Sequence, residues 1–188
     1  MTRQQKYRGQ LGYTIDQTIL IVAVIAILIT MIIGSVGWDL LSRAGGTKLA
    51  SHLKQFEQAN GTFFSTHTVW PHEALGGGGS NPTNNFRALI TESVLDTAYQ
   101  DDARNLLPSY ADSSPVEHDF GGGGNITMEE DTYGNQTYLK ITMTGVPVNE
   151  YNEADESIDG EIDMNDGRVR GSQSGNTVTL EYFANAVN

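Results

Sequence analysis

One uninterrupted apolar run near the N-terminus constrains this chain more than any other feature. From Ile19 to Trp38 no charged residue occurs, and Thr30 and Ser35 carry the only polar side chains. As a helix rising about 1.5 Å per residue, a run of this length covers about 30 Å, the hydrocarbon thickness of a bilayer. The run therefore predicts a helix that is buried in lipid or in a protein core.

Charge is distributed unevenly around this run. The chain has 11 Lys and Arg against 23 Asp and Glu, a net charge of -12. Residues 1–12 contain Arg3, Lys6 and Arg8 and no acid, so the remainder of the chain has 8 basic and 23 acidic side chains, or -15. This asymmetry predicts an N-terminus in the cytoplasm and a body outside it. An acidic body also argues against direct nucleic-acid binding, which needs a basic surface.

The junction at the start of the run has a recognisable order of residues. GYTIDQ at 12–17 places a Gly, an aromatic residue and a polar pair between the basic leader and the apolar helix. This arrangement resembles the type IV prepilin family, which includes the pseudopilins of type II secretion. The resemblance implies that a prepilin peptidase cleaves between Gly12 and Tyr13, and that Tyr13 becomes a methylated N-terminus.

One position departs from the family pattern. The fifth residue after the cleavage site is usually Glu and is Gln17 here, with Asp16 beside it. In the family this carboxylate is thought to meet the positive amino terminus of a neighbouring subunit. We therefore assign the assembly role jointly to Asp16 and Gln17, although neighbouring residues on a helix point about 100° apart. A subunit without the usual Glu is also compatible with a minor or tip component.

The resemblance implies a structural subunit of a type IV pilus-like extracellular filament and no enzymatic activity. The precursor would sit in the inner membrane until the pilus assembly machinery extracts it, and copies would then pack helix to helix. The filament would lie at the cell surface, or in the periplasm if the chain is a pseudopilin. The residues expected in the filament core are apolar and lie along the run: Ile19, Leu20, Val22, Ile25, Leu28 and Ile32.

An amphipathic pattern continues the helix beyond the run. Leu49, Leu53, Phe56 and Phe63 recur at helical spacing, and Trp70-Pro71 predicts a stop. The predicted divisions are a leader at 1–12, a transmembrane and filament-core helix at 13–38, an amphipathic continuation at 39–70 and a globular head at 71–188. Gly34 and Gly37 are candidates for helix bending, although glycine is also common in membrane helices.

The head shows helix and strand signals. NFRALITESVLDTAY at 85–99 predicts a helix, and Gly134-Asn135 and Ser174-Gly175-Asn176 predict two hairpin turns. The predicted fold is α+β: a long N-terminal helix, half transmembrane and half amphipathic, packed on an antiparallel sheet of about four strands. This is also the plan of a pilin head.

An acidic stretch at 149–166 contains the only candidate metal ligands that we assign. Oxygen ligands alternate along a segment that we interpret as turn-rich, which suits calcium, although the order is not that of an EF-hand. A solvated acidic loop explains the same residues. The candidate calcium ligands are Asp159, Glu161, Asp163, Asn165 and Asp166.

Two other function classes stay open. A pseudopilin of a type II secretion system and a signal-anchored extracytoplasmic binding domain that never polymerises both suit the sequence. Three N-glycosylation sequons also occur, at Asn60, Asn125 and Asn135, although so short a pattern arises often by chance.

Overall fold

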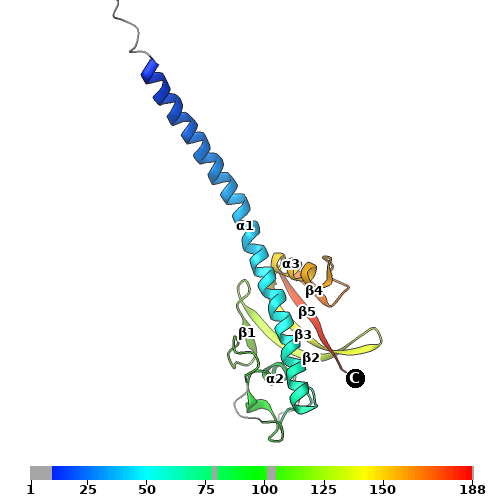
Figure 1. Ribbon diagram of the computed structural model, residues 1–188. Coiled ribbons are helices and arrows are strands. Elements are labelled where there is room, and N and C mark those ends of the chain that lie inside the picture. The colour runs from blue at the N-terminus through cyan, green and yellow to red at the C-terminus, as the bar shows by residue number, and fades with distance from the viewer. Residues whose placement is uncertain (1–9, 78–79, 101–104, 188) are drawn as a thin grey trace, which may run out of the picture. The chain divides into compact units, whose positions relative to one another are not determined.

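The computed structural model describes residues 10–77, 80–100 and 105–187, and the side chains of 10–16 and 34–43 lie outside this description. The chain divides into two compact units, Met1–Leu41 and Ser42–Asn188. Helix α1 (Gln10–His67) begins in the first unit and ends in the second (Figure 1). It stops before Thr68, whose φ of 60° is left-handed, and before the predicted Trp70-Pro71 step.

The second unit contains one antiparallel sheet of five strands. These are β1 (Val116–His118), β2 (Gly124–Tyr133), β3 (Gln136–Pro147), β4 (Val169–Ser174) and β5 (Thr177–Val187). Their spatial order is β1-β2-β3-β5-β4, so β5 lies between β3 and the edge strand β4 (Figure 1). The α+β class and the two hairpins are confirmed, whereas the expected number of about four strands is wrong. The additional strand is β1, whose three residues are too few for an alternating pattern.

The predicted transmembrane half of the helix is contradicted. Within the described ranges, no helix is both long enough and apolar enough to cross a membrane. A span takes about 20 consecutive apolar residues.

The core of the second unit forms between the end of α1 and one face of the sheet. The predicted stripe Leu49, Leu53, Phe56 and Phe63 is buried, with exposures of 3% or less. On the sheet, Leu139, Ile141 and Met143 of β3 are fully buried, as their alternation predicts. The Phe56 ring packs edge-on against Phe86 at a centroid distance of 5.1 Å.

The helix predicted over 85–99 is wrong. A short helix α2 (Pro82–Arg87) begins earlier, capped by the Asn81 side chain, and a 3-10 turn η1 (Glu92–Val94) follows. Thr91 separates the two because its backbone is extended and its hydroxyl accepts a hydrogen bond from the Ser93 amide. Such local side-chain bonds compete with a continuous helix.

Only the second part of the acidic stretch, residues 160–166, lacks helix and strand, in keeping with the turn-rich segment expected around the candidate calcium ligands. Helix α3 (Val148–Asp159) occupies its first part and ends at Gly160, whose φ of 86° is the left-handed conformation of a helix C-terminus. Tyr151 and Ala154 are fully buried beneath it. Helix α3 packs closely on α1, since a Cβ on Gly46 would lie 2.2 Å from the Glu153 Cβ.

Candidate functional sites

The apolar segment of α1 is the first candidate site. The six predicted filament-core side chains are each between 48% and 65% exposed, and their apolar neighbours are similarly exposed. Exposed apolar surface costs about 25 cal/mol per Å² relative to burial, so a segment of this size favours a covering partner. Gln17 is exposed at the start of the same segment.

Several predicted residues lie where only the backbone is described. Gly12, Tyr13 and Asp16 belong to the helical backbone at the start of α1, and Gly34 and Gly37 to its continuation. Their side chains and surroundings are outside the described residues. The cleavage, assembly and bending roles therefore stay predictions.

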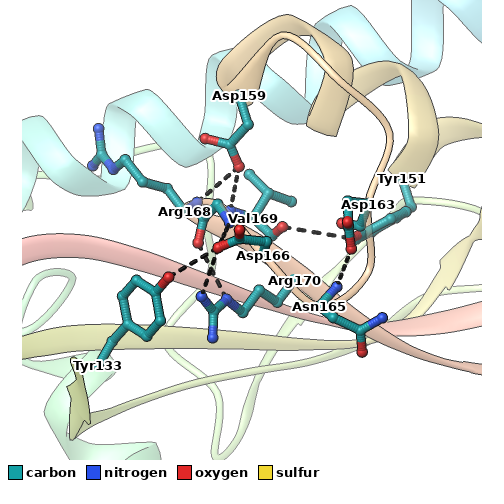
Figure 2. Close-up of polar contacts among 10 residues, drawn as sticks. Tyr133, Tyr151, Asp159, Asp163, Asn165, Asp166, Arg168, Val169 and Arg170 are labelled. Carbon is teal, nitrogen blue, oxygen red and sulfur yellow. Dashed lines mark hydrogen bonds and ion pairs between the residues drawn. The ribbon is translucent and has the colours of Figure 1, made fainter.

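The second candidate site is the connection between α3 and β4, residues 160–168. Three side chains on one face of α3, spaced four residues apart, hold this connection through its backbone. The Tyr151 hydroxyl donates to the Asp163 carbonyl oxygen at 3.1 Å, and the Asp155 carboxylate accepts from the Asp163 amide at 2.8 Å. The Asp159 carboxylate accepts from the amides of Arg168 and Val169, both at 2.8 Å (Figure 2).

The other predicted calcium ligands lie along the same connection and do not converge. Asp163 accepts from the Asn165 amide at 2.7 Å, and Asp166 accepts from the Tyr133 hydroxyl at 2.9 Å (Figure 2). Glu161 is exposed. Among the described residues, no group of three or more acidic or histidine side chains is placed to hold a metal ion. The carboxylates of Asp159, Asp163 and Asp166 accept hydrogen bonds from the protein itself, and calcium at this connection stays a prediction.

Arg168 joins the connection to α1 and the sheet. Its guanidinium forms an ion pair with Glu57 of α1 at 2.9 Å and donates to the Ala184 carbonyl of β5 at 2.7 Å. The Tyr182 hydroxyl donates to the same Glu57 at 2.7 Å. Because three elements meet at this arginine, the arrangement serves to fix the connection against the core.

Asp155, like Tyr151 and Arg168, is a residue of this site that sequence reasoning missed. It is 1% exposed, and burial raises the pKa of its carboxyl from an ordinary 3.8 to about 6. The hydrogen bond from the Asp163 amide opposes this shift in the pKa of Asp155, because it favours the charged form. Its spacing from Tyr151 and Asp159 on α3 is a signal that becomes visible only once the helix is recognised.

Replacing Asp155 with Asn is expected to make stability less dependent on pH. A raised pKa means that the folded protein binds this proton more tightly than the unfolded chain, so the carboxyl contributes stability below pH 4 that is lost as pH rises through 6. At pH 7 the Asp155→Asn variant should exceed the parent by about 1 to 3 kcal/mol, and the gap should close near pH 4. Urea unfolding followed by tryptophan fluorescence measures this gap.

The exposed Glu156 on the same helix provides a matched control. Glu156→Gln should change the unfolding free energy by less than about 0.5 kcal/mol at either pH. If Asp155→Asn were equally destabilised at pH 4 and pH 7, the hydrogen bond to Asp163 would outweigh the cost of burying the charge.

The comparisons with known proteins add no relative. No family model, curated protein or solved structure matches the chain. The absence of a spanning helix among the described residues leaves the predicted inner-membrane precursor without support.

Proposed function

We propose that this chain is a structural subunit of a type IV pilus-like filament, displayed at the cell surface and held together by packing of α1 against copies of itself. The observation that carries the proposal is the exposed apolar segment from Ile19 to Ile33. Its side chains surround the helix on all sides, as expected of a helix that neighbours enclose completely. The basic leader and the Gly12-Tyr13 junction support the same assignment through their resemblance to prepilins.

The core of the second unit does not use the apolar segment of α1. The described core is built from residues at or beyond Leu49, so the Ile19–Ile33 segment supplies none of it. The apolar segment is then available for contacts between subunits, where burial by identical helices contributes about 0.8 kcal/mol per CH₂ group. In such a filament the small residues of the run, Ala23 and Ala26, let neighbouring backbones approach.

The test combines the mature N-terminus with the state of assembly. Mass spectrometry of the protein from its own cells should find a chain that begins at methylated Tyr13, and electron microscopy of sheared surface material should find fibres containing it. Cleavage without surface fibres would instead indicate a pseudopilin. An intact Met1 without fibres would contradict assembly and indicate an anchored binding domain.

Replacing Ile25 with Asp is expected to abolish the fibres. A carboxylate at a position enclosed by neighbouring helices costs several kcal/mol per subunit unless it is paired, and the cost repeats at every subunit. Gln58→Asp places the same group on an exposed part of α1 in the second unit and should leave fibres at parental numbers. Counting fibres per cell by electron microscopy, at equal subunit levels by immunoblot, distinguishes the two. Abundant fibres from Ile25→Asp would contradict the proposal.

A further inference from the structure

The structure separates the three glycosylation sequons by accessibility. Asn60 is fully buried in α1, which excludes it from any modifying enzyme in the folded protein. Asn125 is exposed but lies within β2, paired in register with Glu117 of β1. Asn135 lies outside the strands, in the two-residue turn between β2 and β3. An acceptor asparagine is expected on a surface turn, because the attached glycan is bulky and must remain in solvent.

The turn presents Asn135 in a defined conformation. Gly134 precedes it with a φ of 63°, and the strands pair on both sides, with Tyr133 opposite Gln136 and Thr132 opposite Thr137. A glycine with positive φ at the first central position is what a tight hairpin of this length requires. The Asn135 side chain is exposed, in the turn that joins β2 to β3.

A shallow, solvent-open hollow of about 500 Å³ adjoins this asparagine. Uncharged side chains line it: Tyr133, Asn135, Gln136, Thr137, Tyr138 and Val187. Aromatic faces beside amide and hydroxyl groups suit a sugar ring, which offers C–H groups on one face and hydroxyls around its edge. The volume is large enough for a monosaccharide unit.

The aromatic part of the hollow is fixed before any ligand arrives. The Arg170 guanidinium lies 3.7 Å from the centre of the Tyr133 ring, and the Tyr133 hydroxyl donates to Asp166 at 2.9 Å (Figure 2). The Phe183 ring lies 5.6 Å from Tyr133 and 6.0 Å from Tyr138. A platform that is already ordered loses little entropy when a sugar packs on it.

We propose that Asn135 is an N-glycosylation site whose first sugar rests in this hollow. The donor is an oligosaccharide carried on a lipid phosphate or pyrophosphate. The Asn135 Nδ2 forms a bond to the anomeric carbon, the bond from that carbon to the phosphate oxygen breaks, and the lipid phosphate leaves while Nδ2 loses one proton. No oxidation or reduction takes place. The modification goes beyond the filament role and does not depend on assembly.

Peptide mapping of the full chain from the cells that make it tests the site. Trypsin releases residues 105–140 as one peptide that contains both Asn125 and Asn135, and electron-transfer fragmentation places the glycan on one of them. We expect it on Asn135, with complete loss in Asn135→Gln and Thr137→Ala and retention in Asn125→Gln and Thr137→Ser. An unmodified parental peptide, or a glycan on Asn125 alone, would overturn the proposal.

The role of the hollow has its own measurement. The glycosylated parent should melt at a higher temperature than Asn135→Gln, because the sugar covers the solvent-accessible parts of Tyr133 and Tyr138. In a Tyr133→Ala background, which keeps the sequon, the same comparison should show a much smaller difference. An equal difference in both backgrounds would mean that the sugar does not use the hollow.

Discussion

Replacing Gly124 with Ala should cost more stability than adding a methyl group at any other glycine whose surroundings the structure describes. An added Cβ would lie 1.7 Å from the Thr144 carbonyl oxygen and 2.9 Å from the His118 ring nitrogen Nε2. Real contacts never approach 1.7 Å, so the strands β2 and β3 must separate or the residue must twist out of register. We expect a loss of about 3 to 5 kcal/mol in the free energy of unfolding, measured by urea unfolding of the full chain.

The reason for this close approach is a hydrogen bond that passes over the glycine. His118 pairs with Gly124 in register, and its Nε2 donates to the Thr144 carbonyl of β3 at 2.9 Å. The Phe120 amide donates to the other ring nitrogen at 3.2 Å. Histidine thus spans three strands, β1 to β3, and only a residue without a side chain fits at the central position.

Gly122 of the same glycine tract supplies the control. A Cβ there would meet no atom within 4 Å, and its φ is not left-handed. Gly122→Ala should therefore change the unfolding free energy by less than about 0.5 kcal/mol. Equal losses in the two variants would mean that flexibility of the tract, and not the contact with Thr144, determines its role.

Local chemistry explains which elements were predictable from sequence. Both hairpins follow from a turn signal flanked by alternating residues, as with Gly134-Asn135 between β2 and β3. The buried stripe of α1 follows from helical spacing in the same way. Each of these signals depends on neighbours within a few positions, so tertiary context was not needed to recognise them.

Helix α3 illustrates what local patterns hide. Eight acids across residues 149–166 suggested a solvated segment. The apolar spacing of Tyr151, Ala154 and Ile158, followed by Gly160, was the helix signal within it. What decides the outcome is burial: Tyr151 lies so close to Gly171 that a Cβ there would meet the ring at 3.0 Å. That contact joins residues 20 positions apart and cannot be inferred from either segment alone.

The candidate sites also differ in whether a local sequence pattern or tertiary packing defines them. An apolar run remains apolar wherever the chain places it, so the Ile19–Ile33 segment was visible from sequence. Which carboxylate of an acidic stretch is buried depends on packing, so Asp155 was not distinguishable from Glu156 or Asp163. Likewise, the sequence does not show that Tyr133 and Tyr138 lie together beside Asn135, because their contacts with Phe183 and Arg170 form only when the strands pair.

Replacing Lys140 with Met should be the second large loss, and it arises from charge. Lys140 is central in the sheet and 8% exposed, and its ammonium lies 2.6 Å from Asp131, 3.1 Å from Glu129 and 3.3 Å from Glu181. Burial alone would lower the pKa of this lysine, but the hydrogen bonds to Asp131 and Glu129 outweigh it and raise the pKa. The lysine is therefore held charged among three carboxylates that have no other cation at this distance among the described residues.

Methionine keeps most of the apolar stem of Lys140 and removes the charge, leaving three carboxylates in mutual repulsion. The carboxylates are each 38% to 45% exposed, so solvent reduces this repulsion, and we expect a loss of about 2 to 3 kcal/mol at pH 7.

The hydrogen bond from Lys140 lowers the pKa of Asp131, so the stability that this carboxylate contributes is present above about pH 4 and is lost as pH falls through the lowered pKa. The difference between Lys140→Met and the parent should therefore narrow below pH 4. Lys54→Met, at an exposed position of α1, should lose less than about 0.5 kcal/mol at either pH. If the loss in unfolding free energy of Lys140→Met were the same at every pH, the packing of the Lys140 stem, and not its charge, would account for the stability that this residue contributes.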